Sequence, residues 1–434
     1  MAISWRVFFN LLNDVSKVYD GRSRYMRLFK GFRQIDRFYK KIDEGDEVQL
    51  SVAHSGSAQL IADICRQNGA MWIKVAQYLS CRPDLLPMEY IDKFSEFQTI
   101  SNTSLATTFN QVGPILLQQW QENWDTQFSA FNIVPVASGS IAQVYQAQLT
   151  KTESTKERQV AIKVRVPGVE LLYEQDSIVL KGLAKCLEPF YKEVDISAIV
   201  DEIIATTKAE LNFSTERDSM LDYQKLVRKT PVKTPELMQY LCSSQILVTE
   251  WVSGLPLQAY INKNGMDEVV CGAIRSLAAI LLEDIFVHGL YHGDPHPGNV
   301  MLDTSDALVL IDFGYCGRID SAQRFHYALL MMALMGKTPN PEYQNLFERA
   351  GFKAKNPAFF DQVGVYVDSL IKDETVDASR RLEGLLNSLR KNRIILPQGF
   401  VGILRVILLL TTLFKKADLD FDAVFQESVK SIGT

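Results

Sequence analysis

Hydrophobic residues recur at helical spacing in the first part of the chain and alternate with polar residues further on. Between residues 55 and 125 no alternation of period two occurs, so this region is predicted to be mostly helical. Three prolines are expected to divide it into shorter helices: Pro83, Pro87 and Pro114. The sequence therefore predicts a helical region ahead of any sheet.

The pattern changes midway, where apolar and polar residues begin to alternate. This alternation predicts strands at 143–149 and 160–166, joined by a polar turn. Two helical stretches follow, at about 169–190 and 196–228, and a further strand is predicted at 246–252. A small β-containing lobe is the expected result.

The remainder of the chain is predicted to be mainly helical from Pro256 onward, apart from a short hairpin formed by residues 300–302 and 307–311. The expected organisation has four parts. These are a basic amphipathic segment, a helical extension, a small lobe and a large helical lobe, at residues 1–50, 51–125, 126–252 and 253–434.

The N-terminal segment is strongly basic. Residues 1–41 carry ten Lys or Arg and three acidic residues, with apolar residues at helical spacing. Such a helix suits an anionic membrane surface, and it equally suits packing on the main domain with its charges in water. The acidic run at 43–47 is predicted to be a linker.

Composition narrows the class of protein. Hydrophobic residues make up 47% of the 434 residues, which is typical of a globular chain, and the net charge of -5 argues against nucleic-acid binding. The six cysteines are scattered, with no C-x-x-C pair, so a reducing compartment is expected.

No secretory signal and no run of 18 apolar residues is seen. The longest candidate, 403–410, is interrupted by Arg405 and is interpreted as a buried helix. These features predict a cytoplasmic protein, or one peripheral at the inner face of a membrane.

The strongest chemical signal is the stretch His292-Gly293-Asp294-Pro295-His296-Pro297-Gly298-Asn299, followed by Asp312-Phe313-Gly314. Protein kinases place an Asp and an Asn five residues apart, followed by D-F-G. Phosphoryl transfer needs oxygen ligands for Mg²⁺, which Asn299 and Asp312 are predicted to supply. Asp294 is the predicted catalytic residue that orients an attacking hydroxyl or water.

A second element is Val160-Ala161-Ile162-Lys163, which matches the V-A-I-K signature of kinases. A strand lysine in this signature neutralises the phosphates of the nucleotide, and a glutamate on a helix holds it. Glu216 is the candidate for that glutamate. Glu250, near the end of the last small-lobe strand, is added as a nucleotide-contacting residue.

A third element aligns with the glycine-rich loop that covers phosphates in kinases. Only one of its three glycines is present here, because alanines take the other two positions. Small residues still allow the backbone to approach phosphates. The predicted nucleotide-binding residues of this loop are Ala137, Ser138, Gly139, Ser140, Ile141, Ala142 and Val144.

Together these features resemble the UbiB (AarF-like) family of atypical, protein-kinase-like proteins, which has an alanine-rich loop and a helical extension with a K-x-G-Q motif. The stretch from Ile73 to Pro87 matches that extension closely, and the resemblance covers roughly residues 55–320. It implies an α+β, two-lobed kinase-like fold, mostly α overall, that binds ATP and Mg²⁺. It further implies a role in ubiquinone or related prenyl-lipid metabolism, with a lipid or quinone-precursor substrate and peripheral membrane contact.

The resemblance also implies a lid over the active site that hinders protein phosphorylation. Lys74 and Gln77 would project from it, and Lys74 would pair with acids of an E-x-D motif, here beginning at Glu210. Two positions depart from the family pattern. Ala76 replaces the glycine of K-x-G-Q, and Asn212 replaces the aspartate of E-x-D, which leaves Glu210 as the acid for Lys74.

Four alternatives remain to be weighed. A small-molecule kinase of the aminoglycoside or choline type shares the Asp–Asn spacing and D-F-G, and a nucleotide-dependent binding protein would need no turnover. A zinc site built from His288, His292 and His296 is disfavoured because intervening Gly and Pro forbid one continuous helix. An ordinary protein kinase is disfavoured because no A-P-E sequence follows Asp312-Phe313-Gly314.

Overall fold

The computed structural model describes residues 22–39, 42, 46–98, 109–120, 127–150, 158–188, 195–373 and 376–425. Contacts divide the chain into two compact units. The first contains residues 1–80, 87–217 and 237–251, and the second contains residues 81–86, 218–236 and 252–434. The four-part division expected from the sequence stays a prediction.

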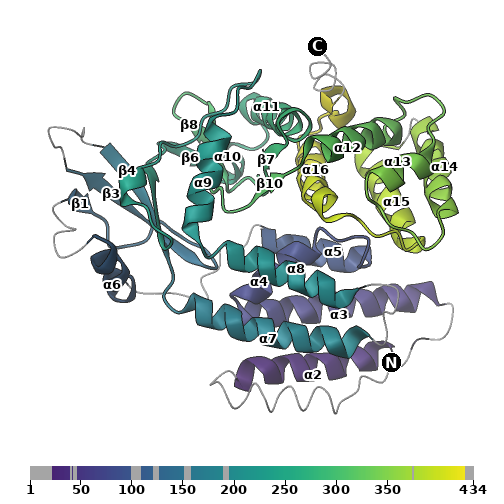
Figure 1. The fold of residues 1–434 in the computed structure, drawn as a ribbon, viewed down its shortest axis with the longest axis horizontal. Helices are drawn as coiled ribbons and strands as arrows, with labels where there is room; N and C mark the ends of the chain where they lie inside the picture. The colour runs from purple at the N-terminus through teal and green to yellow at the C-terminus, as the bar shows by residue number, and fades with distance from the viewer. Residues whose placement is uncertain are drawn as a thin grey trace. The chain divides into compact units, whose positions relative to one another are not determined.

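Helices make up most of the first unit (Figure 1). They are α2 (Arg22–Tyr39), α3 (Glu47–Asn68), α4 (Met71–Leu79), α5 (Met88–Ser95), the 3-10 turn η1 (Glu96–Gln98), α6 (Phe109–Trp120), α7 (Val169–Leu187) and α8 (Ile196–Ala209). Asp46 begins α3 by accepting a hydrogen bond from the Gln49 amide at 2.9 Å, so the end of the predicted acidic linker is a helix cap.

The described part of the basic segment forms α2, which packs against α3. Its apolar side chains Tyr25 and Leu28 are buried, and the guanidinium of Arg24 lies 2.9 Å from the buried carboxylate of Asp176. The apolar face of α2 is therefore used for packing within the first unit. Residues 1–21 lie outside the described residues.

The sheet of the first unit is antiparallel, in the order β1-β3-β4-β5, with β2 also paired to β3. Its strands are β1 (Phe128–Phe131), β2 (Ala137–Ser138), β3 (Ala142–Leu149), β4 (Arg158–Arg165) and β5 (Ile246–Glu250), and the 3-10 turn η5 (Gln239–Leu241) precedes β5. The inward side chains of the central strands form an apolar core with α6, including Tyr145, Val160 and Ile162. The strand predictions for 143–149, 160–166 and 246–252 agree with β3, β4 and β5 to within two residues.

Two predictions for this unit were wrong. Pro114 lies inside α6, where burial of Val112, Leu116 and Trp120 outweighs the missing backbone hydrogen bond. The helical stretch expected at 196–228 is two helices, α8 and α9 (Phe213–Gln224). Asn212 separates them, because its side chain accepts a hydrogen bond from the Ser214 amide at 3.0 Å at the start of α9.

The second unit carries two small sheets and the remaining helices. Strands β6 (Gly254–Pro256), β8 (Val300–Asp303) and β9 (Leu308–Leu310) form one sheet, and β7 (Leu290–His292) pairs with β10 (Cys316–Arg318). The predicted hairpin at 300–311 is β8–β9. Helices α10 (Leu257–Asn264) and α11 (Glu268–Glu283) precede the π-helical turn η6 (Asp284–His288), and α11 is largely buried.

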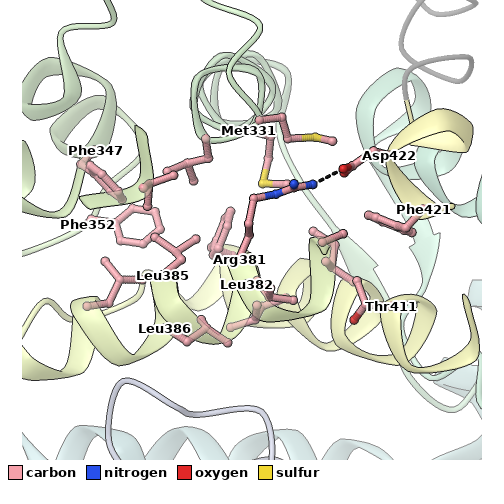
Figure 2. A pocket seen from close by; sticks show the side chains of 18 residues that line it. Met331, Phe347, Phe352, Arg381, Leu382, Leu385, Leu386, Thr411, Phe421 and Asp422 are labelled. Atoms are coloured by element: carbon pink, nitrogen blue, oxygen red, sulfur yellow. Dashed lines mark hydrogen bonds and ion pairs between the residues drawn. The ribbon is translucent and has the colours of Figure 1, made fainter. Parts of the chain in front are cut away.

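Five further helices complete the second unit: α12 (Ser321–Leu334), α13 (Tyr343–Arg349), α14 (Ala358–Lys372), α15 (Ala378–Lys391) and α16 (Gln398–Lys416). They surround a mainly apolar cavity of about 70 Å³ (Figure 2). The ion pair between Arg381 and Asp422 is the charged part of its lining.

Helix α16 is longer than the apolar run identified in the sequence. Within the described residues it is the helix whose length and composition would allow it to cross a membrane, and most of it is buried inside the protein. That burial agrees with the interpretation of this region as a buried helix.

Candidate functional site

The lysine of the V-A-I-K sequence lies in the middle of the small-lobe sheet. Lys163 is on β4, in register with Val144 of β3 and Leu247 of β5. Its Nζ lies 2.9 Å from both carboxylate oxygens of Glu216 on α9. The lysine side chain is 17% exposed and the glutamate side chain 4%, so the pair is largely shielded from water. The structure thus brings together the two residues that the sequence paired.

The alanine-rich loop forms a tight hairpin between β2 and β3. Ala137 pairs with Val144, Ser138 pairs with Gln143, and the Gly139 amide donates to the Ala142 carbonyl at 2.8 Å. Because Val144 also pairs with Lys163, this hairpin adjoins the lysine within one sheet. Ser140 and Ile141 lie in its turn, and the predicted loop is therefore a continuous strand–turn–strand unit.

Glu250 is the last residue of β5 and is exposed. It pairs in register with Val160, the first residue of the V-A-I-K sequence. Its place at the end of the strand beside β4 is compatible with the predicted nucleotide contact, which stays a prediction.

Asp294 is held by its neighbours in the second unit. Its backbone amide donates to Nδ1 of His292 at 3.2 Å, and its carbonyl accepts from Nδ2 of Asn299 at 3.0 Å. Burial lowers the pKa of His292, which favours a neutral ring. Since Nδ1 accepts, Nε2 carries the proton and donates to the Ile311 carbonyl at 3.1 Å.

Asp312 adopts an unusual backbone conformation. Its φ is 59°, which a non-glycine residue rarely adopts, and such strain clusters at functional sites. Its Oδ1 accepts a hydrogen bond from the Gly314 amide at 3.2 Å. The preceding residue, Ile311, donates its amide to the Asn299 carbonyl at 2.9 Å, so backbone and His292 contacts connect the Asp294, Asn299 and Asp312 segments.

The predicted lid residues lie in the first unit. Nζ of Lys74 on α4 lies 2.5 Å from Glu210, and both side chains are partly buried. Gln77 donates its side-chain amide to the Phe97 carbonyl at 2.8 Å, a contact inside the helical extension. Asn212 caps α9 as described above, and Glu210 is the acid that meets Lys74. Whether the segment acts as a lid stays a prediction.

The Arg-Pro-Asp sequence after α4 has a packing role in the second unit. Arg82 donates to both oxygens of Asp84, at 2.8 and 2.7 Å, and all of these groups are buried. Asp84 also accepts from the Leu396 amide at 3.3 Å. This conspicuous part of the sequence therefore ties residues 81–86 to the loop before α16.

Two groups near the candidate site were missed by the sequence predictions. Arg405 of α16 donates from Nη2 to Oδ1 of Asp294 at 2.7 Å, across 111 residues of sequence. Asp284 is fully buried, and it accepts from Arg228 at 2.6 Å and from the Tyr223 hydroxyl. Arg405 had a signal in the sequence, since it is the one charge inside the apolar run 403–410.

The Asp284 cluster lies behind the D-F-G phenylalanine. The Tyr223 ring contacts the Phe313 ring with centroids 5.0 Å apart, and His292 contacts the same phenylalanine at 5.2 Å. Burial raises the pKa of Asp284 while Arg228 opposes that shift. The cluster therefore fixes Phe313, next to Asp312, from the protein interior.

A zinc site receives no support from the geometry. Among the residues that the structure describes, no group of three or more His, Cys, Asp or Glu could hold a metal ion by protein ligands alone. His288 is on η6, His292 is on β7, and His296 accepts from the Gly298 amide. The three histidines have separate local roles.

Comparison with known proteins identifies the class. The model of the ABC1 atypical kinase-like domain matches residues 100–341, more than half of the chain. An uncharacterized Synechocystis protein, slr0889, is 31% identical over an alignment of 290 residues that covers 64% of this chain and 69% of that protein. AarF domain-containing protein kinase 1 of Gallus gallus is 27% identical over 317 residues, covering 71% of this chain and 59% of the relative.

The fold is also found among solved structures. The structure of Rv3197 with erythromycin, from Mycobacterium tuberculosis, matches with a TM-score of 0.56 and 23% identity. The match covers 88% of this chain and 98% of that chain. The fold is thus that of a protein-kinase-like protein. The chain belongs to the ABC1 atypical kinase-like family, which confirms the AarF-like resemblance seen in the motifs.

Proposed function

We propose that the protein binds ATP with Mg²⁺ and hydrolyses it or transfers its terminal phosphoryl group to a small acceptor. The observation that carries this proposal is the ion pair of Lys163 with both oxygens of Glu216 at 2.9 Å. An ammonium held in this way is pre-oriented toward nucleotide phosphates, as the lysine–glutamate pair is in protein kinases. If the Lys163–Glu216 ion pair served only to stabilise the fold, it would not need to lie beside a hairpin of small residues.

The residues proposed for Mg²⁺ suit that ion. Asn299 uses its side-chain nitrogen on the Asp294 carbonyl, so its amide oxygen is the atom available to a metal. Asp312 presents a carboxylate from a strained backbone position. Carboxylate and amide oxygens are the ligands that Mg²⁺ prefers, with substrate phosphates and waters completing the shell. When bound, the ion neutralises charge on the phosphate oxygens.

We assign the role of base to Asp294, because its backbone is fixed at both the amide and the carbonyl. A fixed carboxylate can accept the proton of a hydroxyl or a water in phosphoryl transfer. The acceptor we propose is water or a small lipid-like molecule of ubiquinone or related prenyl-lipid metabolism. Support for the lipid comes from the family resemblance.

Membrane contact through the basic segment is part of the same proposal. Lys30 and Arg37 are exposed on α2, whereas the apolar face of that helix is packed inside the first unit. Contact by residues 22–39 would therefore be electrostatic, worth up to about 1 kcal/mol per basic residue near an anionic surface, and weakened by salt. The test is binding to anionic vesicles in low salt. If replacing these basic residues by Gln leaves the binding unchanged, the proposed membrane contact is contradicted.

The test of Mg-ATP binding is Asp312→Asn. It removes a charged metal ligand, and we expect the Mg²⁺-dependent thermal stabilisation by ATP to be lost. Asp306→Asn is the matched control, since Asp306 also has a φ of 59° but lies at the tip of the β8–β9 hairpin. Equal stabilisation of the Asp312→Asn variant and the control by Mg-ATP would refute the assignment.

A further inference from the structure

Arg405 is the one charged residue within the apolar run 403–410 of α16. Its neighbours Leu404 and Val406 are buried, yet its guanidinium reaches Oδ1 of Asp294 at 2.7 Å. The side chains of Arg405 and Asp294 are only 16% and 17% exposed. The guanidinium also lies over the Tyr315 ring, 5.4 Å from its centroid. An arginine in this position has lost most of its contact with water, and this loss is costly unless an ion pair compensates for it. The Asp294 carboxylate is the group that provides this compensation.

The packing of α16 makes this contact feasible. Gly402 lies three residues before Arg405 and therefore on the same helix face. A Cβ at Gly402 would lie 2.4 Å from the Tyr291 hydroxyl and 3.1 Å from the Tyr315 hydroxyl. Only glycine thus lets α16 approach closely enough for Arg405 to reach the Asp294 loop.

We propose that Arg405 is a positioning residue for Asp294, and that the Gly402–Arg405 face of α16 belongs to the catalytic apparatus. The inference rests on the proposed function. Three groups then hold Asp294 at three points: His292 at its backbone amide, Asn299 at its carbonyl and Arg405 at its carboxylate. Arg405 is the one of the three that fixes the side-chain torsions.

Arg405 donates to Oδ1 of Asp294 and so fixes the orientation of the carboxylate. In the proposed reaction this carboxylate takes the proton of the acceptor hydroxyl or water, whose oxygen forms a bond to the terminal phosphorus of ATP. The bond to the bridging oxygen breaks, and its electron pair leaves with ADP. Without Arg405 the carboxylate rotates among several rotamers, and fewer of the bound complexes are aligned.

The test is steady-state ATP turnover of the full chain carrying Arg405→Met, Arg405→Lys or Thr412→Ala. Thr412 is the control on the same helix, because its hydroxyl is exposed and donates only to the Leu408 carbonyl of its own helix. We expect Arg405→Met to lower kcat about 10- to 100-fold, the loss typical of a misplaced catalytic group, with KM for ATP changed less than about twofold. Arg405→Lys should recover part of kcat, and Thr412→Ala should match the wild type.

Melting temperatures separate positioning from a purely structural role. If Arg405 only stabilised α16, Arg405→Met would melt earlier but keep its kcat below the melting range, and the inference would be overturned. Gly402→Ala provides an independent variant, since it pushes α16 away without removing the charge, and it should also lower kcat with KM retained. If the wild type turns over ATP and Arg405→Met has the same kcat, the role of Arg405 is refuted and the proposed function stands. Absence of turnover in the wild type refutes the proposed function and the inference with it.

Discussion

Two lysine–glutamate pairs in the first unit differ in how firmly they are held. Lys163 meets both oxygens of Glu216 at 2.9 Å, and the glutamate is almost fully buried. Lys74 meets Glu210 at 2.5 Å, and those side chains are 19% and 13% exposed. The first pair joins the centre of a sheet to a helix, whereas the second joins two helices, α4 and the end of α8. A pair shared between two oxygens on rigid elements suits catalysis, and a more exposed single contact suits a segment that must open.

The largest effect should come from breaking the firmer pair. Lys163→Met is expected to lower ATP turnover by at least about 100-fold. The substitution removes a pre-oriented positive charge that would stabilise the negative charge developing on the phosphate in the transition state. Lys181→Met is the matched control, since Lys181 pairs with Asp201 at 2.8 Å on the exposed surface of the same unit. Steady-state turnover is the measurement, and comparable losses in the two variants would contradict the distinction between the lysines.

A third ion pair in the same unit, between Arg24 and Asp176, has a fully buried carboxylate. Burial raises the pKa of Asp176 to about 6, against the lowering effect of Arg24. A carboxyl whose folded pKa is raised stabilises the fold below its unfolded pKa, and that contribution is lost as pH rises through about 6. We expect the unfolding free energy of the wild type, relative to Asp176→Asn, to fall by up to about 3 kcal/mol between pH 4 and pH 7.

Denaturant unfolding at several pH values measures this difference. Asp201→Asn is the control, because Asp201 is exposed and should leave the pH dependence unchanged. Parallel pH profiles for the wild type and Asp176→Asn would show that the Arg24 contact fully offsets the effect of burial on the Asp176 carboxyl, and would contradict this prediction.

The looser pair predicts a smaller effect on activity. A partly exposed ion pair is worth up to about 1 kcal/mol, which corresponds to about fivefold in an equilibrium. If the Lys74 segment restrains the site as a lid, Lys74→Ala should raise ATP turnover about two- to fivefold. Gln67→Ala, a change at the end of α3 in the same extension, is the control. Turnover that is unaltered by Lys74→Ala would remove the regulatory role of the pair.

The smallest effect is expected at Asn212. Asn212→Asp restores the second acid of the E-x-D motif, two residues after Glu210, and keeps the cap of α9, because an aspartate oxygen can also accept from the Ser214 amide. The added charge at a helix N-terminus should change stability by less than about 1 kcal/mol. Turnover should fall by at most about twofold as Lys74 is held more firmly. A higher turnover rate in this variant than in the wild type would contradict the prediction that holding Lys74 more firmly slows turnover.

Local sequence patterns determined much of this protein. Alternation of apolar residues located β3, β4 and β5, since a strand with one buried face needs period two. The motifs gave Lys163, Asp294, Asn299 and Asp312, and Glu216 was recognised as the partner of Lys163. The Lys163–Glu216 contact is present in the structure, and the assignment of the other residues to a phosphate and Mg²⁺ site stays a prediction, based on the residue types and spacing that this chemistry requires. The roles of the residues remain proposals.

Only the tertiary structure decided which distant groups meet. Arg405 reaches Asp294 across 111 residues, and Arg228 and Tyr223 meet Asp284 on a separate element. No local period records such contacts, because the long-range packing of α16 and α11 creates them. Burial likewise kept α6 helical through Pro114, since the apolar contacts of Val112 and Leu116 outweigh one lost hydrogen bond. The sequence therefore determined the chemical groups and their local elements, and packing determined how those groups are oriented.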